Sequence, residues 1–289
     1  MTIYYNHLGS NGRLGNQMFQ YASFRGIAAN RGFAWKIPPE DTETTSNYGL
    51  FECFKMIHVK EENLGLSPSQ YPNIGENDHS FDEALFNGCP DNSNIHAYLQ
   101  TEKYFKNIEN EIREDFQFKD DIYESCKEVI DEVGDAIFIH VRRGDYLGSP
   151  NHHPTLTPEY YENALEKFDS EIPVFVFSDD LVWCKEQDFL KSDRFLLSEN
   201  HIKYPNKVLL GDGTVDHSLI PYWDLCLMTL CKGAIIANSS LSWWGAWLQN
   251  GAGQVIAPNP QNWFGTALSH LDKTDIVPET WTIQEWSNQ

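Results

Sequence analysis

The fold of this chain is decided by the stretch Ile137-Phe138-Ile139-His140-Val141-Arg142-Arg143-Gly144-Asp145-Tyr146, where an apolar run leads directly into two arginines. Further apolar runs follow at 174–177, 195–197, 234–237 and 254–257. The helical patterns that alternate with them cover 158–168, 180–190, 216–231 and 241–249. Continuously apolar strands between helices are typical of a parallel sheet with both faces covered, because β-α-β crossovers place helices there. The second half of the chain is therefore predicted to be a doubly wound α/β domain.

The first half begins with the same alternation. A β-type run at 3–5 precedes a loop with several glycines at 9–15, a helical pattern at 16–30 and another β-type run at 33–37. Gly32 is expected to end the helix, since glycine readily adopts the left-handed conformation that follows a last helical turn. This order of elements predicts a strand, a glycine loop and a helix that open a separate α/β layer.

Residues 38–95 carry no such pattern. They are rich in Asn, Asp, Pro and Ser, and are expected to form irregular surface segments with short helices. A strand at 95–99 and helices at 109–116 and 121–133 are expected to follow.

The length of 289 residues exceeds the usual size of a single core. We therefore expect an N-terminal domain over residues 1–134 and a C-terminal domain over residues 135–289, and one long single domain stays open as the alternative. Whether the last segment packs back on the N-terminal domain stays open at this point.

Charge and composition exclude several classes of protein. The chain has 21 Lys and Arg against 42 Asp and Glu, a net charge of −21, and no block of basic residues interrupts this excess. A surface this negative repels nucleic-acid backbones and anionic lipid headgroups. A hydrophobic content of 41% supplies a core and argues against disorder.

The six cysteines show neither a C-x-x-C spacing nor a Cys/His ligand pattern. This favours reduced thiols in the cytoplasm over a disulfide framework or a zinc site. The first residues lack the features of a signal peptide, and no window reaches the ~18 apolar residues of a membrane span. We therefore expect a cytoplasmic protein without a membrane-spanning segment.

The arginines that follow strand 136–141 are the first candidate ligand contacts, because ligands of doubly wound sheets bind beyond the carboxyl ends of the strands. A guanidinium group is planar and permanently charged, which suits a diphosphate. Arg142 is interpreted as a phosphate ligand. For Arg143, a phosphate contact and an ion pair with Asp145 both stay open. For His140, a ligand contact and a place in the core stay open.

Asp179 and Asp180 follow the next strand. Such a pair serves either as a metal-bridging site or as one nucleoside contact beside one helix cap. Because no third oxygen ligand is nearby in the sequence, we expect no metal, with Asp180 capping the helix and Asp179 contacting a ribose or base.

Asn238, Ser239 and Ser240 join a strand to a helix start. Small hydroxyl residues there leave N–H and O–H groups open to an anion, as at many helix N-termini that bind phosphate. One of the two serines is expected to be the N-cap. The tryptophans of the helix are expected to be structural: Trp243, Trp244 and Trp247.

The loop Gly12-Arg13-Leu14-Gly15-Asn16-Gln17 lacks the spacings of the common phosphate-binding loops. It nevertheless opens the first helix of a separate domain, so we expect it to face the arginines across a cleft. The backbone around Gly15 and the Asn16 amide would then lie near the reacting atoms. Surface or rim roles are expected for a last group of polar residues: His152, His153, Asp212, Asp216 and His217.

Four motifs together resemble the α-1,2-fucosyltransferases of glycosyltransferase family 11. They are Gly12–Gln17, His140–Tyr146, the block Phe177-Ser-Asp-Asp180 and the block from Asn238 to Trp247. They occur in the family's order and span most of the chain. Residues 38–95 carry no recognised motif, and acceptor specificity is expected to be decided there.

The resemblance implies a GT-B-type enzyme with two Rossmann-like domains that face a cleft. It implies inverting transfer of fucose from GDP-β-L-fucose, usually to O2 of a galactose, without a metal or any other cofactor. The N-terminal domain would be the acceptor side and the C-terminal domain the GDP-sugar side. By position, the resemblance places Arg142 at the β-phosphate, His140 at the GDP portion, Ser239 and Ser240 at the diphosphate, Asp179 at the nucleoside and Asn16 near the transferred sugar.

No general base is evident in the sequence. Asp145 is the first carboxylate to test as the base, and the alternative is that the proton ends on a phosphate oxygen or in solvent. Two further readings stay open: a fucosyltransferase of another linkage or sugar nucleotide, and a catalytically silent module that binds a GDP-sugar or a glycan. The expected partners are GDP-fucose and a galactoside acceptor, with a lipid-linked glycan compatible with such a chain, and no oligomeric state is indicated.

Overall fold

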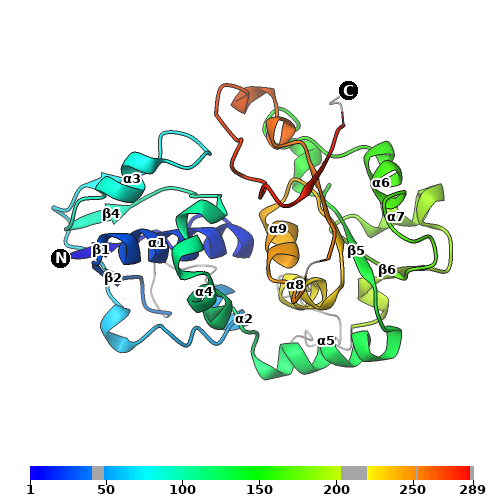
Figure 1. Ribbon diagram of the computed structural model, residues 1–289, viewed down its shortest axis with the longest axis horizontal. Coiled ribbons are helices and arrows are strands. Elements are labelled where there is room, and N and C mark those ends of the chain that lie inside the picture. The colour runs from blue at the N-terminus through cyan, green and yellow to red at the C-terminus, as the bar shows by residue number, and fades with distance from the viewer. Residues whose placement is uncertain (41–48, 203–219, 252, 287–289) are drawn as a thin grey trace. The chain divides into compact units, whose positions relative to one another are not determined.

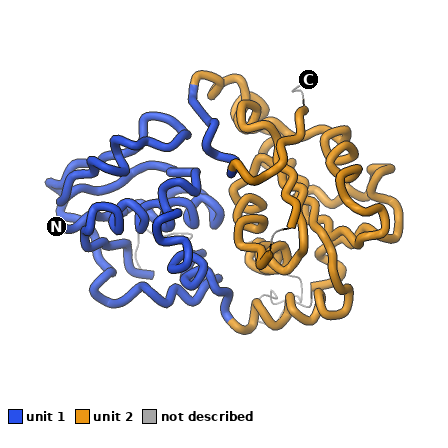
Figure 2. The backbone as a smooth tube through the Cα atoms, viewed as in Figure 1, with its two compact units in different colours: residues 1–119, 271–278 blue, residues 120–270, 279–289 orange. Residues whose placement is uncertain are grey.

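The computed structural model describes residues 1–40, 49–202, 220–251 and 253–286. The chain divides into two compact units, which Figure 2 colours separately. Unit 1 comprises residues 1–119 and 271–278, and unit 2 comprises residues 120–270 and 279–289.

Unit 1 is built on a four-stranded parallel sheet of order β2-β1-β4-β3. Its helices and strands are β1 (Thr2–Tyr4), α1 (Leu14–Arg31), β2 (Ala34–Lys36), α2 (Gly49–Cys53), β3 (Asn73–Ile74), α3 (Glu83–Gly88), β4 (Ser93–Ile95) and α4 (Glu109–Asp115). The predicted end of α1 is confirmed, because Gly32 adopts the left-handed conformation with φ 63° and donates its N–H to Ala28 O and Ala29 O. The strand expected at 95–99 is wrong: β4 ends at Ile95, and Leu99 has a φ of 55°, which no strand adopts.

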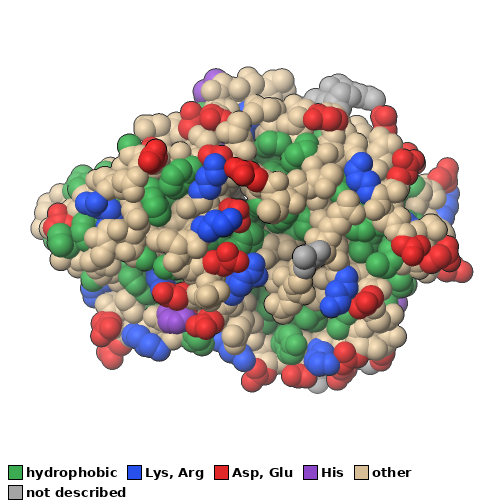
Figure 3. Space-filling view, viewed as in Figure 1, with side chains coloured by type: hydrophobic (Ala, Val, Ile, Leu, Met, Phe, Trp, Pro, Cys, Tyr) green, Lys and Arg blue, Asp and Glu red, His purple; other side chains and the backbone are tan. Residues whose placement is uncertain are grey.

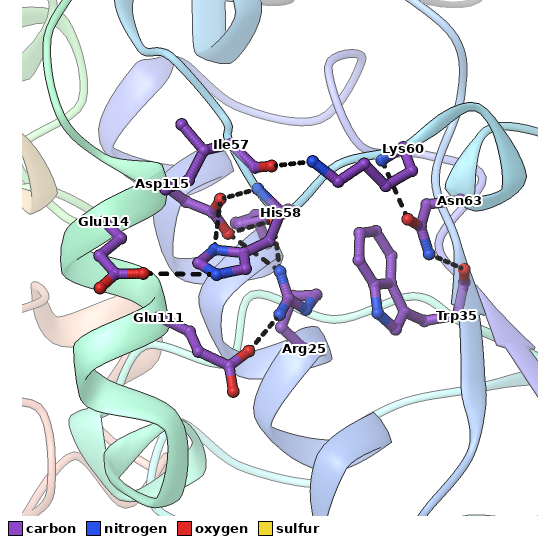
Figure 4. Close-up of polar contacts among 10 residues, drawn as sticks. Arg25, Trp35, Ile57, His58, Lys60, Asn63, Glu111, Glu114 and Asp115 are labelled. Atoms are coloured by element: carbon purple, nitrogen blue, oxygen red, sulfur yellow. Dashed lines mark hydrogen bonds and ion pairs between the residues drawn. The ribbon is translucent and has the colours of Figure 1, made fainter.

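A buried ion pair ties α1 to α4 in unit 1 (Figure 4). Asp115 is fully buried and accepts hydrogen bonds from Tyr21 Oη at 2.7 Å, Arg25 Nη1 at 2.9 Å and the His58 backbone N–H at 2.7 Å. The Arg25 guanidinium also stacks 4.4 Å from the Trp35 ring centroid. A buried charge pair is tolerated only when its remaining hydrogen-bonding groups are satisfied, and these contacts satisfy them.

The segment 271–278 returns to unit 1 late in the sequence. Asp275 pairs with Lys103 at 2.6 Å and accepts from the Phe81 N–H at 3.0 Å, and Asp272 O accepts from the His79 N–H at 3.1 Å. The chain therefore contributes a short C-terminal piece to its first unit.

The division between the units falls between Lys119 and Asp120, not at Gly134 as expected. The reason is that α5 (Asp120–Val133) packs against α8 (Ile220–Leu230) in unit 2. Cys126 Sγ, for example, donates to Trp223 O at 3.4 Å.

Unit 2 is built on a six-stranded parallel sheet of order β10-β9-β8-β5-β6-β7. Its remaining elements are β5 (Ile137–Val141), α6 (Pro158–Leu165), β6 (Val174–Ser178), α7 (Leu181–Glu186), β7 (Phe195–Leu197), β8 (Ala234–Ile235), α9 (Ser240–Trp247), β9 (Val255–Pro258) and β10 (Thr282–Gln284). In Figure 1, α6 and α7 cover one face of this sheet, and α8 and α9 cover the other. The predicted doubly wound sheet is confirmed, although β10 was not expected, and the start of the helix expected from Asp216 lies outside the described residues.

All six cysteines are buried, and none of them forms a disulfide bond. Within the described ranges, no helix is both long and apolar enough to cross a bilayer. Figure 3 shows acidic and basic side chains interspersed on the surface in view.

Candidate functional site

The connections of the unit 2 sheet diverge between β5 and β8. From β5 the chain proceeds to β6 and β7 on one side, whereas β8, β9 and β10 extend the sheet on the other side. Open α/β sheets bind their ligands beyond the carboxyl ends of the strands at such a switch point. The residues at that position are Arg142 to Tyr146 after β5 and Asn238 to Ser240 after β8.

Tyr146 joins these two segments. Its hydroxyl donates to Asn238 O at 3.0 Å, and its ring stacks on His153 with centroids 4.8 Å apart. The Tyr146 ring also contacts Arg142, whose guanidinium carbon lies 5.1 Å from the ring centroid. Tyr146 ends the motif His140–Tyr146, but the sequence analysis assigns it no role. The position of Tyr146 shortly after the two arginines is the signal that could have suggested a role for it.

Asn238 is itself fixed by the chain around it. Its side-chain nitrogen donates to Pro154 O at 2.9 Å and to Trp263 O at 3.0 Å, and the residue is buried. The carbonyl that accepts from Tyr146 is therefore held in one position. The two contacts use the amide nitrogen of Asn238, whereas its Oδ1 is buried without a hydrogen-bond partner among the described residues. The expected contact of Asn238 with the GDP-sugar stays a prediction.

The Arg142 guanidinium lies between two carboxylates. Nη1 contacts Asp179 Oδ2 at 2.9 Å, and Nη2 donates to Asp145 Oδ1. The side chain is only 15% exposed, and its Nε is buried without a hydrogen-bond partner among the described residues. Arg142 thus stands at the switch point with its charge balanced by neighbours and with donors to spare.

Arg143 takes a different direction. Its Nε pairs with Asp180 Oδ2 at 3.0 Å, and its guanidinium carbon lies 4.3 Å from the Trp183 ring centroid. The considered pair between Arg143 and Asp145 is wrong, because Arg143 pairs with Asp180 and Asp145 pairs with Arg142 instead.

Asp179 and Asp180 hold both arginines in place. Asp179 Oδ1 accepts from the Arg143 backbone N–H at 2.9 Å. Asp180 is the N-cap of α7 and accepts from the Trp183 N–H at 3.1 Å, so its predicted capping role is confirmed. A Cβ at Gly144 would lie 2.4 Å from Asp179 Oδ2, so only glycine lets the loop approach this carboxylate.

The described residues contain no group of three or more His, Cys, Asp and Glu side chains that could hold a metal ion. Metal-independent chemistry stays a prediction.

The N-terminus of α9 has unused backbone donors. Ser239 is the N-cap, with an extended backbone at φ −138° and ψ 130°, yet its side chain makes no capping hydrogen bond. Ser240 is the first residue of the helix. The N–H groups of a first helical turn have no carbonyl partner within the helix, and together with the helix dipole they favour an anion. The tryptophans of α9 are buried, as predicted: Trp243, Trp244 and Trp247.

His140 lies in the core of unit 2, only 4% exposed. Burial, and secondarily the Arg142 charge, lowers its pKa to about 3, so the ring is neutral at physiological pH. Its backbone carbonyl accepts from Tyr161 Oη at 3.2 Å, and its Nδ1 has no partner among the described residues. The expected contact with GDP stays a prediction, and Nδ1 is the atom through which it would be made.

The glycine loop of unit 1 forms the tight turn expected before α1. Gly12 has a φ of 82°, and a Cβ on it would lie 2.6 Å from Asn16 Nδ2. Asn16 Oδ1 accepts from Gln100 Nε2 at 2.8 Å, and Gly15 is buried in the first turn of the helix. The amide and this turn are thus fixed within unit 1, and their expected place beside the arginines stays a prediction.

Glu76 is a residue of unit 1 that sequence reasoning missed, because it lies in the stretch without motifs. It accepts hydrogen bonds from the Tyr98 N–H at 3.0 Å and the Leu99 N–H at 2.9 Å. Burial raises its pKa to about 7, although these two N–H groups act in the opposite direction. Through these two hydrogen bonds, the Glu76 carboxylate fixes the backbone that follows β4. Other polar residues considered from the sequence lie outside the described residues: Asp212, Asp216 and His217.

The family model for "Glycosyl transferase family 11" matches residues 2–285. The chain belongs to this family. Among curated proteins, an alpha-1,2-colitosyltransferase of Escherichia coli is 30% identical over 93% of this chain and 95% of its own length. A galactoside alpha-(1,2)-fucosyltransferase 1 of Gorilla gorilla gorilla is 26% identical over 83% of this chain and 64% of its own length.

Solved structures support the fold of this family 11 glycosyltransferase. The crystal structure of NodZ alpha-1,6-fucosyltransferase soaked with GDP-fucose matches with a TM-score of 0.52 at 12% identity, over 86% of this chain and 92% of that one. At this identity the likeness concerns the fold. The predicted GT-B-type α/β architecture, with one parallel sheet in each unit, is confirmed.

The depressed pKa of His140 predicts a loss of stability in acid. The unfolded chain binds a proton near pH 6.5, whereas the folded chain resists protonation down to about pH 3. Between these values, His140 lowers the free energy of unfolding by about 1.4 kcal/mol for each pH unit of acidification. Urea unfolding of wild type, His140→Gln and His140→Phe from pH 7.5 to 4.5 should show the variants losing less stability than wild type below pH 6.5. Parallel curves for all three proteins would contradict the assignment.

Proposed function

We propose that this chain transfers L-fucose from GDP-β-L-fucose to O2 of a galactose-containing glycan, with inversion at the fucose anomeric carbon. The observation that carries the proposal is the Tyr146–Asn238 hydrogen bond of 3.0 Å, which holds Arg142 and the start of α9 together at the switch point of the sheet. The name of the galactoside fucosyltransferase relative supports this choice of sugar. Family membership and the names of both relatives support the 1,2 linkage.

The chemistry to be catalysed is the departure of GDP from the sugar. Negative charge grows on the β-phosphate oxygens as the bond to the anomeric carbon breaks and an oxocarbenium-like transition state forms. The Arg142 guanidinium and the free N–H groups at Ser239 and Ser240 are fixed positive groups that stabilise this charge. Because they are fixed before the substrate binds, little reorganisation is needed during the reaction.

The carboxylates around Arg142 define how a diphosphate enters. Two guanidinium groups and three carboxylates meet at this edge: Arg142, Arg143, Asp145, Asp179 and Asp180. Asp145 is the most exposed of the three acids, at 53% for its side chain, against 28% and 25% for Asp179 and Asp180. It therefore yields its place on Arg142 to a phosphate oxygen, while Asp179 continues to orient the guanidinium.

Displacement would also change what Asp145 can do. Once Arg142 no longer pairs with it, the carboxylate could accept a proton, as a general base for the acceptor hydroxyl requires. The alternative is that bond breaking runs ahead of attack, so that the proton ends on a phosphate oxygen or in solvent. Asn16 of unit 1, which cannot act as a base, would orient the transferred sugar.

A second donor is favoured by one observation. The relative that is 30% identical over nearly the whole chain is described as a colitosyltransferase. Colitose is L-fucose without the 3-hydroxyl group, so the same phosphate site would serve both donors. The two candidates differ only in whether the site recognises this hydroxyl group. A site that hydrogen-bonds it discriminates strongly against the donor that lacks it.

Mixing the purified protein with GDP-fucose and lactose should release GDP and yield a fucosyl product linked to O2 of galactose. The same reaction with GDP-colitose decides between the two donors, and an arm with EDTA tests the expected independence from metal ions. Linkage analysis of the product separates α-1,2 transfer from other linkages. GDP binding without GDP release for any pairing of these donors with a panel of β-galactosides would support the silent binding module instead.

Arg142→Ala should reduce kcat by a factor on the order of a hundred to a thousand, as loss of one charge-stabilising donor typically does. The matched control is Arg194→Ala, which removes an arginine at the opposite, amino edge of the same sheet and should leave kcat near wild type. Circular dichroism verifies the fold of both variants. Near wild-type turnover of folded Arg142→Ala would defeat the proposed role.

Asp145→Asn should tighten GDP binding by up to about fivefold, because it removes an exposed charge that competes with phosphate for Arg142. Titration calorimetry measures the effect. The control is Asp188→Asn, which breaks an exposed ion pair of the same spacing with Lys191 and should leave GDP affinity unchanged. Weaker or unaltered binding by Asp145→Asn contradicts the displacement.

A pH–rate profile of the same variant tests Asp145 as the general base. Loss of the acidic limb in Asp145→Asn identifies Asp145 as the base, and an unchanged profile assigns the proton to phosphate or solvent.

A further inference from the structure

A polar pocket in unit 1, here called the amide pocket, lies outside the site described above. It has a volume of about 340 Å³, and the side chains that matter for its chemistry are Asn6, Ser67, Tyr71, Asn73, Asn94 and His7. Its volume falls at the lower end of the roughly 300–1,000 Å³ typical of small-ligand sites. Part of its wall comes from residues 66–73, within the stretch that carries no recognised motif.

The amide pocket occupies the switch point of the unit 1 sheet. From β1 the chain proceeds to β2 on one side, whereas β4 and β3 lie on the other side of β1. Asn6 follows β1, and Asn94 belongs to β4, so the pocket lies where these two strands diverge in their connections. This is the position at which parallel α/β sheets bind ligands.

Hydrogen bonds between its side chains make the wall rigid. Asn94 Oδ1 accepts from the Asn6 N–H at 2.8 Å, and Asn94 Nδ2 donates to Asn73 Oδ1 at 2.6 Å. Asn6 in turn donates through Nδ2 to Ser67 Oγ at 2.8 Å and accepts from the Ser67 N–H at 3.0 Å. These bonds leave the N–H donors of Asn73 and the hydroxyl hydrogen of Ser67 for a ligand. A wall fixed in this way recognises hydroxyl groups at defined positions.

The wall is uncharged although the chain is strongly acidic. The chain has a net charge of −21, yet none of the described residues that line the pocket is Asp, Glu, Lys or Arg. His7 is neutral at physiological pH as well, because burial, and secondarily the neighbouring His96, lowers its pKa. An anionic ligand such as a nucleotide would find no counter-charge here, and a cation would find no carboxylate.

Apolar surface completes the wall. Tyr71 packs edge-on against Tyr4 with centroids 5.7 Å apart, which fixes the orientation of its ring, and Leu66 is 46% exposed beside it. A sugar ring has the complementary surface, with hydroxyl groups for amides and C–H groups for an aromatic face. Neutral amides, hydroxyls and one fixed aromatic ring therefore match a neutral sugar better than any charged ligand.

We propose that the amide pocket binds a neutral sugar residue of the acceptor glycan. The proposal rests on the proposed function, since it assigns the acceptor side of the same transfer. It adds the location of the subsite, the neutral class of sugar, and the residues that select it. Tyr71 supplies the stacking face, and Asn73 and Ser67 supply hydrogen bonds.

The test measures glycan binding directly, without the donor. Saturation-transfer NMR is recorded for wild type with methyl β-D-galactoside, methyl N-acetyl-β-D-glucosaminide and methyl α-D-mannoside, with methyl β-D-glucuronide as the charged comparator. At least one neutral glycoside should bind, and the glucuronide should bind more weakly. Tyr71→Ala and Asn73→Ala should each weaken binding on the order of tenfold, as expected for loss of one ring face or hydrogen bond. Tyr71→Trp should retain binding.

Tyr123→Ala is the control, because it removes an exposed tyrosine from α5 in unit 2 and should leave glycan binding unchanged. GDP affinity, measured on the same samples, should be unchanged in the two pocket variants, because GDP is assigned to unit 2, and circular dichroism and thermal unfolding verify that the variants are folded. Absence of binding by all three neutral glycosides, or unchanged binding in folded Tyr71→Ala and Asn73→Ala, overturns the proposal. Failure of the proposed function has a different signature: glycoside binding that depends on Tyr71 without transfer from either GDP-sugar.

Discussion

The structure of unit 2 depends on how one guanidinium group, that of Arg142, is held at the switch point of a parallel sheet. β5 delivers it to the carboxyl edge, Asp179 contacts Nη1 at 2.9 Å, and Tyr146 ties its loop to the start of α9. Asp179 is itself held by the Arg143 backbone N–H, which Gly144 permits by its close approach. Each of these contacts serves to place a permanent positive charge beside unused helix N–H groups.

The phosphate site proposed for so acidic a chain requires this local arrangement. The net charge of −21 repels a nucleotide at long range, so attraction must come from charges at contact distance. The neighbouring carboxylates keep the two arginines fixed and balanced when no phosphate is present. The most exposed of them, Asp145, is the partner that we propose a diphosphate replaces. The amide pocket of unit 1 is uncharged, which suits the neutral glycan proposed for it, since such a ligand needs no counter-charge.

Much of unit 2 could be predicted from the sequence, because its strands are continuously apolar and polar residues follow them directly. The same logic predicts that Arg142, Asp179 and Ser239 follow strands of this sheet, and the structure places them there, whereas their roles stay predictions. Unit 1 was less predictable: the turn at Leu99 depends on Glu76, whose carboxylate binds backbone that lies far along the chain. The amide pocket was missed for a similar reason. Its three asparagines come from the loop after β1, from β3 and from β4, and no periodicity in the sequence marks them. The ion-pair partners of Arg142 and Arg143 could not be predicted, because they depend on the directions of the side chains, which the order of residues does not determine.

A crystal structure of the protein with GDP tests the central claim most directly. The account predicts the β-phosphate within hydrogen-bond distance of Arg142 and of the backbone N–H groups at the start of α9, with Asp145 moved off the guanidinium and Asp179 still in contact with it. GDP bound elsewhere, or bound here with the pair between Arg142 and Asp145 intact and no phosphate contact to Arg142, would contradict it.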